Sequence, residues 1–274
     1  MPHLLQLRCL PPSGEAGARY PFTVPAVRAL AGLPDGLPLD APVTCFVGEN
    51  GSGKSTLLEG LAAACGLPAV GSDEVAHDPT LEPARVLGRR LKLAWRARTT
   101  RGFFLRAEDF FGFAKRLARL RAELEARADE VRAEYAAADR SAWATGLALG
   151  PLKGSIADME RRYGADPDAR SHGESFLTLF QARLAPKGLY LLDEPEAALS
   201  PQRQLALLAM LRDAVAEGSQ FVLATHSPLL LAYPGARLYS FDDPPPRAVA
   251  WETLEHVRLT RDFLAAPERF LRHL

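Results

Sequence analysis

The chain has 274 residues, of which 47% are hydrophobic and 24% charged, as in an ordinary globular protein. Its 33 basic and 33 acidic residues balance, so net charge gives no global argument for binding nucleic acid or membranes. No apolar run approaches the roughly 18 residues that a bilayer-spanning helix needs. We therefore expect no direct membrane insertion, and either one large α/β domain or one domain with an insert.

The cysteines and the N-terminus predict a cytoplasmic protein. Cys9, Cys45 and Cys65 have no C-x-x-C spacing, which is typical of buried thiols in a reducing compartment. Residues 1–10 lack the charge order, long apolar core and cleavage site of a signal peptide.

The first part of the chain predicts short strands separated by loops. Residues 3–10 alternate apolar and polar side chains and predict a strand. Residues 20–24 predict a second strand, which Pro25 ends. Residues 26–42 are rich in glycine and proline and predict a loop. Residues 43–47 are a β-prone run.

Residues 48–56, Gly-Glu-Asn-Gly-Ser-Gly-Lys-Ser-Thr, fit the pattern G-x-x-x-x-G-K-[ST]. In such a loop the backbone N–H groups point at phosphate oxygens, and glycines allow that close approach. The lysine reaches the β- and γ-phosphates, and the following hydroxyl ligates Mg²⁺. A strand precedes the loop and a helix is predicted at residues 57–64, so the context supports a nucleotide site. The candidate ATP-binding residues are Glu49, Asn50, Gly51, Ser52, Gly53, Lys54, Ser55 and Thr56.

The segment after the phosphate loop is unusually basic. Residues 85–121 hold twelve lysines and arginines against two acidic residues. A solvated arginine-rich face neutralised by acids elsewhere explains this excess, and a polyanion-binding surface is the alternative. Within it, residues 91–95 alternate in a way that favours a strand.

A helical subdomain is predicted between residues 85 and 165. Residues 113–138 carry an apolar stripe and i,i+4 ion pairs, which predict a long helix. Residues 139–151 are expected to break it, and residues 155–163 predict a shorter helix. This length suits a packed subdomain or a short hairpin, not a long coiled-coil arm.

The second half of the chain alternates strands with helices. The predicted elements are a helix at 176–184, a strand at 189–192, a helix at 201–215, strands at 221–224, 238–241 and 248–251, and an amphipathic segment at 259–274. This alternation predicts a mostly parallel core sheet covered on both faces.

Two of these strands end in polar side chains that suit phosphate chemistry. The strand at 189–192 runs into Asp193 and Glu194, at the sheet edge where ligands bind in open α/β folds. We expect Asp193 to hold Mg²⁺ together with Ser55, and Glu194 to activate a water molecule. His226 follows the next buried strand and is expected to reach the γ-phosphate from the same edge.

In this order, the phosphate loop, Ser-His-Gly-Glu-Ser, Asp-Glu-Pro-Glu and Thr-His-Ser-Pro resemble the ATP-binding-cassette (ABC) ATPases. The resemblance covers residues 40–60 and 165–230 and is nearest to the soluble branch, with the RecF-type, SMC-type and stand-alone bacterial ATPases. It implies a P-loop NTPase fold spanning residues 1–274 as one ABC ATPase head, with an antiparallel β-layer from residues 3–45.

The resemblance also implies an ATP-dependent homodimer that sandwiches two nucleotides. Ser171, Gly173 and Glu174 would contact the γ-phosphate bound by the other copy, as a helix N-terminus can.

One departure concerns the metal shell. ABC ATPases usually carry a glutamine between the phosphate loop and the signature, and residues 56–170 contain none. Glu108, next to Asp109, is the candidate replacement and metal ligand. For adenine stacking, Tyr20 and Phe22 remain alternatives, and either can equally belong to the core.

Taken together, the sequence predicts a soluble Mg²⁺-dependent ATPase that converts ATP and water to ADP and phosphate. Nucleic acid is the leading candidate for what the ATP cycle acts on, because of the arginine-rich segment. The alternatives are the nucleotide-binding subunit of an ABC membrane transporter and a regulatory module in which nucleotide binding alone matters.

Overall fold

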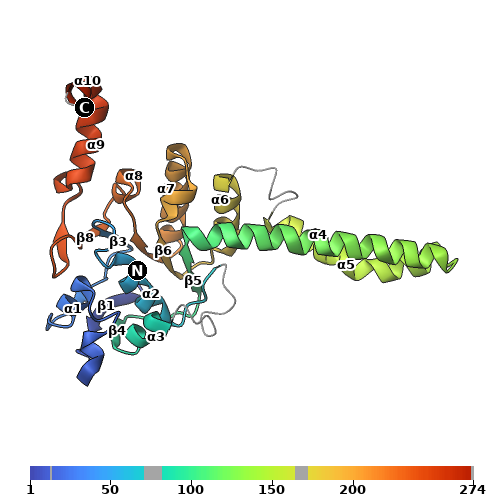
Figure 1. Cartoon of the computed structure of the whole chain (residues 1–274), viewed down its shortest axis with the longest axis horizontal. Coiled ribbons are helices and arrows are strands. Elements are labelled where there is room, and N and C mark those ends of the chain that lie inside the picture. Colours follow the sequence, from blue (N-terminus) through green and yellow to red (C-terminus); the bar gives the residue numbers. More distant parts are fainter. Residues whose placement is uncertain (13, 71–81, 164–171, 273–274) are drawn as a thin grey trace. The chain divides into compact units, whose positions relative to one another are not determined.

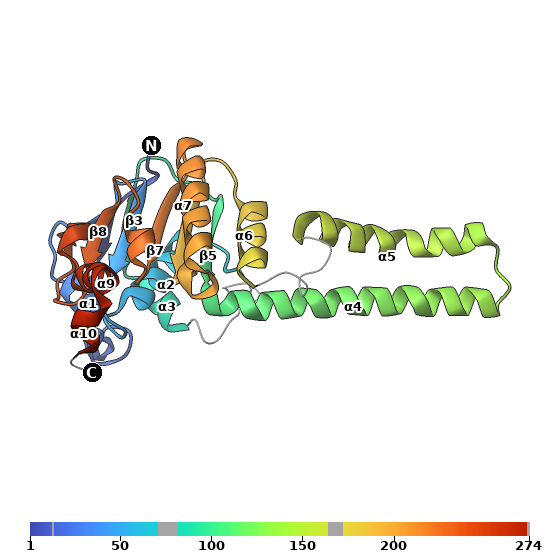
Figure 2. The ribbon, with the colours of Figure 1, turned by 90° about the horizontal axis from the view of Figure 1, so that it is seen from above.

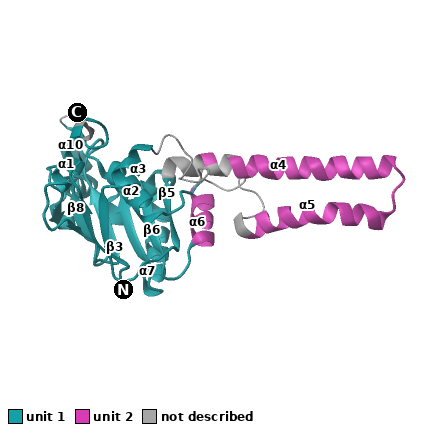
Figure 3. Cartoon of the chain, turned by 90° about the horizontal axis from the view of Figure 1, so that it is seen from below, with its two compact units in different colours: residues 1–107, 184–274 teal, residues 108–183 magenta. Residues whose placement is uncertain are grey.

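The computed structural model describes residues 1–12, 14–70, 82–163 and 172–272. The chain divides into two compact units (Figure 3). Unit 1 comprises residues 1–107 and 184–274, and unit 2 comprises residues 108–183. The phosphate loop and both predicted acidic residues therefore lie in unit 1.

Unit 1 is built on a six-stranded sheet with the strand order β5-β6-β7-β3-β8-β9. Figure 1 labels β5, β6, β3 and β8 of this sheet. Its strands are β5 (Gly102–Arg106), β6 (Leu189–Asp193), β7 (Gln220–Ala224), β3 (Val43–Val47), β8 (Arg237–Ser240) and β9 (Arg247–Val249). All neighbouring pairs are parallel except β8 and β9, which are antiparallel. Every residue of β3, β6 and β7 is buried, as expected for central parallel strands. The predicted α/β fold with a mostly parallel sheet is confirmed.

A second, antiparallel sheet has the order β2-β1-β4. Its strands are β1 (Leu4–Cys9), β2 (Leu37–Pro38) and β4 (Leu91–Trp95). The β-layer is therefore not confined to residues 3–45, because its third strand follows the phosphate-loop helix. The strand predicted at residues 20–24 is wrong: this segment is a turn, and Pro25 begins helix α1 (Pro25–Leu30).

Helix α2 (Lys54–Cys65) joins the two sheets, since it contacts β6 and β7 as well as β4. Its buried leucines enter a core that includes Leu7 of β1 and Leu191 of β6. Figure 2 shows unit 1 from above. The remaining helices of unit 1 are α3 (Glu82–Gly88), α7 (Pro201–Ala216), α8 (Pro228–Leu231), α9 (Glu255–Ala265) and α10 (Pro267–Leu271).

Unit 2 contains a pair of long helices and a shorter third one: α4 (Ala107–Ala137), α5 (Ala142–Tyr163) and α6 (His172–Arg183). The two long helices lie side by side (Figure 2). They pack through a small core that includes Val131 and Leu149, and an Arg121–Glu160 ion pair of 2.9 Å also joins them. The predicted break at residues 139–151 is limited in the structure to the short turn between α4 and α5. The rest of that prediction is wrong, because α5 continues through the exposed Pro151. The sequence predicts a helical subdomain at residues 85–165, but helical unit 2 begins at Glu108. Residues 91–106 instead supply β4 and β5 to unit 1.

Within the described part of the chain, we find no helix with both the length and the apolarity that membrane crossing requires.

Candidate functional site

The phosphate loop connects β3 to α2 and depends on glycine. Gly51 and Gly53 have φ angles of 82° and 102°, in the region that residues with a side chain rarely adopt. A Cβ atom on Gly53 would also lie 2.6 Å from Cγ1 of Val24. The first turn of α2 follows directly, so its unpaired N–H groups and the positive end of its dipole face the loop. This geometry suits an anion such as a phosphate.

Lys54 is the first residue of α2 and is only 4% exposed. Its Nζ donates hydrogen bonds to the carbonyl oxygens of Gly48 (2.6 Å) and Glu49 (2.9 Å). Burial lowers the pKa of the Lys54 ammonium, while the carboxylates of Glu194 and Asp193 oppose this shift. The lysine therefore sits in the loop as a desolvated cation that an anionic ligand would favour.

Ser55 and Asp193 bring two oxygen donors together. The Ser55 hydroxyl donates a hydrogen bond of 3.1 Å to Oδ1 of Asp193, across 138 positions of sequence. Asp193 ends β6 and is 7% exposed. Burial raises the pKa of its carboxyl from 3.8 to about 7; the Ser55 hydrogen bond opposes this shift and the charge of Glu194 adds to it.

Glu194 and His226 lie at the same edge of the sheet. Glu194 adopts a left-handed conformation (φ 47°), and its N–H donates to the carbonyl oxygen of Ala224 (2.8 Å). Its Oε1 lies 3.9 Å from Nε2 of His226, and the two side chains are 46% and 37% exposed. Both side chains are thus partly accessible to a ligand or to water, although Nε2 of His226 itself is buried.

A pocket of about 380 Å³ lies against the helix side of the loop, lined by Tyr20, Val24, Glu194 and loop residues including Thr56. The Tyr20 hydroxyl is 3.3 Å from Oγ1 of Thr56. Phe22 instead is 4% exposed and belongs to the main core. Of the two aromatic candidates for adenine stacking, only Tyr20 is at the pocket.

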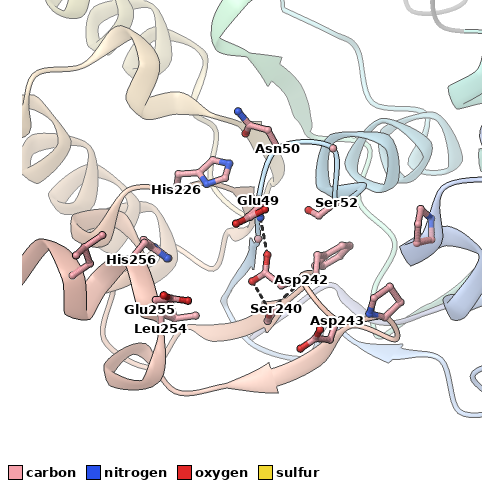
Figure 4. A pocket seen from close by; sticks show the side chains of 16 residues that line it. Glu49, Asn50, Ser52, His226, Ser240, Asp242, Asp243, Leu254, Glu255 and His256 are labelled. Carbon is pink, nitrogen blue, oxygen red and sulfur yellow. Dashed lines mark hydrogen bonds between the residues drawn. The ribbon is translucent and has the colours of Figure 1, made fainter. Parts of the chain in front are cut away.

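A second cavity, of about 840 Å³, lies beside the same loop (Figure 4). Asp242 follows β8, and its Oδ1 accepts a hydrogen bond of 2.7 Å from the backbone N–H of Glu49. His226 and His256 also line this cavity, and burial, with the nearby His226, lowers the pKa of His256. Sequence reasoning missed Asp242 and His256 because neither belongs to a local motif.

Arg106 is a further residue that the sequence did not assign to the site. It ends β5 in register with Asp193, and its guanidinium pairs with Glu59 at 2.7 Å. The signal in the sequence was an arginine at the end of a buried strand. Only the parallel pairing of β5 with β6 places Arg106 next to the Asp193 carboxylate. Glu108, predicted as the replacement for glutamine, lies in α4, and its side chain is outside the described residues.

The predicted signature residues belong to unit 2. Ser171 lies outside the described residues, while Gly173 and Glu174 are in the first turn of α6. Their contact with a nucleotide held by another copy stays a prediction.

Ion pairs neutralise part of the arginine-rich segment at residues 85–121. The pairs are Arg85–Glu82, Arg89–Glu82, Arg106–Glu59, Arg119–Glu123, Arg121–Glu125 and Arg121–Glu160. Its local positive excess is therefore smaller on the surface than in the sequence.

Two segments of the chain match protein-family models. Residues 33–87, with the phosphate loop, match one described as "AAA domain". Residues 175–232, with Asp193, Glu194 and His226, match one described as "AAA domain, putative AbiEii toxin, Type IV TA system". Both matches support the resemblance to P-loop ATPases. The fold of unit 1 is that of a nucleotide-binding ATPase.

Among curated proteins, no sequence matches the chain significantly. Similar solved structures include the Smc head domain of Pyrococcus furiosus, with an extended coiled coil and bound to the C-terminal domain of ScpA (13% identity, TM-score 0.42, 84% of this chain and 94% of that chain covered). Another is a nucleotide-free ATP-binding cassette from an ABC transporter (16% identity, TM-score 0.44, 91% and 90% covered). A third is the ATP-binding subunit of an ABC transporter (18% identity, TM-score 0.39, 86% and 85% covered).

Proposed function

We propose that the protein is a cytoplasmic Mg²⁺-dependent ATPase that works as an ATP-bridged homodimer. The main support is the grouping of Lys54, Ser55, Asp193, Glu194 and His226 at one edge of the sheet. These residues come from three separate parts of the chain, and an isolated glycine-rich turn would not require the last three to lie beside it. The location is supported by three free, buried cysteines.

The residues that would hold Mg²⁺ fit that ion. Ser55 and Asp193 offer hard oxygen ligands within hydrogen-bond distance of each other, and Mg²⁺ in ATPases needs only one or two protein ligands beside phosphates. Among the described residues, no group of three or more histidine, cysteine or acidic side chains could hold a metal ion by itself. When bound, Mg²⁺ would neutralise charge on the phosphates.

The side chains suggest a division of roles in hydrolysis. The loop N–H groups and Lys54 would bind the β- and γ-phosphates, and Asp193 would be held ionised by the metal. Glu194 would orient and deprotonate a water molecule, because it is the exposed carboxylate next to the phosphate pocket. His226 would hydrogen-bond the γ-phosphate. The adenine would stack on Tyr20.

The homodimer follows from the resemblance to ABC ATPases. We propose that units 1 and 2 form one ABC-type head with an inserted helical subdomain. Gly173 and Glu174, with Ser171, would complete the γ-phosphate site of the second copy, and Glu108 would replace the missing glutamine.

Nucleic acid is the partner we propose, and the antiparallel sheet supports it. Arg8 of β1 pairs directly opposite Lys92 of β4, and both side chains are exposed. Like charges opposite each other destabilise a sheet, so an anionic ligand would relieve that repulsion. Binding of a labelled DNA or RNA duplex should weaken steeply with salt and on the double change Arg8→Ala, Lys92→Ala. Co-purification with a membrane protein would instead favour the transporter alternative.

Replacing Glu194 by Gln tests the proposal. Glu194→Gln should abolish phosphate release, leave MgATP binding intact and accumulate a dimer in light scattering. Glu217→Gln, the same change at an exposed residue of unit 1 after α7, is the control and should behave as wild type. A Glu194→Gln protein that stays monomeric in saturating MgATP contradicts the sandwich, and unchanged turnover contradicts the role of Glu194.

A further inference from the structure

Glu196 connects the two loops that carry Glu194 and His226. It lies in the short 3₁₀ turn Pro195–Ala198 that follows β6. Its Oε1 accepts hydrogen bonds from two consecutive backbone N–H groups of the loop after β7, those of His226 (2.6 Å) and Ser227 (3.1 Å). Hydrogen bonds to a carboxylate are about twice as strong as neutral ones, so this is a firm anchor for the loop.

In the described structure, the hydrogen bonds that the Glu196 carboxylate accepts come from the His226 loop, and its charge also acts on Lys54 and Cys45. Its other oxygen, Oε2, is buried and has no hydrogen-bond partner among the described residues. Neither oxygen points to a basic side chain in the ion pairs of unit 1 that the structure describes. The described hydrogen bonds of this side chain therefore assign it to holding the His226 loop.

The anchor matters because the two reactive side chains do not hold each other. Nε2 of His226 is 3.9 Å from Oε1 of Glu194, too far for a hydrogen bond, and it has no other partner among the described residues. Their separation is therefore determined by the backbones that carry them. Those backbones are joined by the Glu194 N–H to Ala224 bond and by the Glu196 carboxylate.

The rest of the loop is fixed at its far side. The Ser227 hydroxyl donates to Oε1 of Gln204 in α7 (2.6 Å) and accepts from the N–H of Leu230 (3.2 Å). The His226 N–H has Glu196 as its acceptor. Loss of Glu196 would thus release the histidine end of the loop while the Ser227 end stays attached.

We propose that Glu196 is a positioning residue that sets the distance between His226 and Glu194. This inference rests on the hydrolysis proposed for the site. Glu196 does not touch the reacting atoms; it acts through the backbone of His226. To hold the His226 N–H, residue 196 must offer an acceptor oxygen; a negative charge alone is not sufficient.

Kinetics of two Glu196 variants separate positioning from general stability. Glu196→Ala removes the acceptor and should lower kcat for ATP hydrolysis by about 10- to 100-fold, with KM within about threefold of wild type. Glu196→Gln keeps an acceptor oxygen and should retain kcat within about threefold, whereas Glu217→Ala should have no effect. An alanine variant with wild-type kcat, or one that changes only KM, overturns the proposal.

A double variant tests whether Glu196 acts through His226. Adding Glu196→Ala to His226→Ala should reduce kcat no further, because the side chain being positioned is already absent. Fully multiplicative losses would show that Glu196 acts elsewhere. If the alanine variant does not fold, Glu196→Asp, which withdraws the acceptor by one methylene, takes its place in both experiments.

Amide hydrogen exchange tests the anchor without relying on turnover. In Glu196→Ala the amide of His226 should exchange at least about tenfold faster than in wild type, while those of β7 stay protected. The amide of Ser227 should change less, because it also donates to Oγ1 of Thr225 (3.0 Å). Unchanged exchange overturns the anchor itself. If wild-type protein shows no ATP turnover that depends on Glu194, while exchange is faster in Glu196→Ala, the anchor is real but the proposed function is overturned. The positioning role is then overturned with it.

Discussion

Asp193 should destabilise the nucleotide-free protein at alkaline pH, and Asp193→Asn should relieve that cost. The carboxyl is 7% exposed, and burial raises its pKa from 3.8 to about 7. The pKa in the folded state is above the unfolded value, so folding favours the protonated form. The cost of ionisation is absent below pH 3.8, grows as pH rises, and is complete above about pH 7.

The size of the effect follows from the pKa. One pKa unit corresponds to about 1.4 kcal/mol, so a pKa of about 7 in place of 3.8 corresponds to at most about 4 kcal/mol. Asparagine also buries a polar group, which costs about 1–3 kcal/mol when imperfectly paired. We therefore expect Asp193→Asn to raise the free energy of unfolding by about 1–2 kcal/mol at pH 8.

Urea unfolding at a series of pH values measures this difference, without nucleotide or Mg²⁺. The advantage of Asp193→Asn should change little between pH 8 and pH 7 and then decrease toward pH 5. Asp213→Asn is the control, because Asp213 is exposed and should give a small difference with little dependence on pH. A less stable Asp193→Asn protein at pH 8, or a difference that does not change with pH, would refute the reasoning.

Three further changes test other parts of unit 1. Lys54→Ala should reduce binding of a fluorescent ATP analogue at least about tenfold, because the desolvated cation of the loop is removed; unchanged affinity would contradict its role. Gly53→Ala should cost about 1–3 kcal/mol in thermal unfolding, because φ is 102° and the new Cβ would meet Val24; wild-type stability would show that the loop relaxes freely. Leu191→Ala should cost about 2–5 kcal/mol in urea unfolding, since Leu191 is fully buried, and a loss below 1 kcal/mol would contradict the described core. The Cys45 thiol, whose pKa burial raises to about 12, should react with a thiol reagent only as the protein unfolds; rapid reaction in native buffer would contradict its burial.

Much of the fold was predictable where local pattern and burial agree. The apolar run Leu189–Leu192 is part of a central buried strand, and the helix beginning at Pro201 starts where the Ser-Pro pair predicts. The prediction failed at residues 20–24, where Pro21 and Pro25 interrupt an apolar segment that has no strand partner. It also failed at Pro151, whose exposed position lets α5 continue.

The sequence by itself determined the phosphate loop and the order of its partner motifs. Those features depend on neighbouring residues: glycines permit the backbone angles, and an acidic pair directly follows a buried strand. Only the tertiary structure decided that Arg106 lies beside Asp193, that Asp242 binds the Glu49 amide, and that Glu196 holds His226. Each of these contacts joins elements brought together by strand pairing and packing in the sheet, so no local spacing along the chain encodes it.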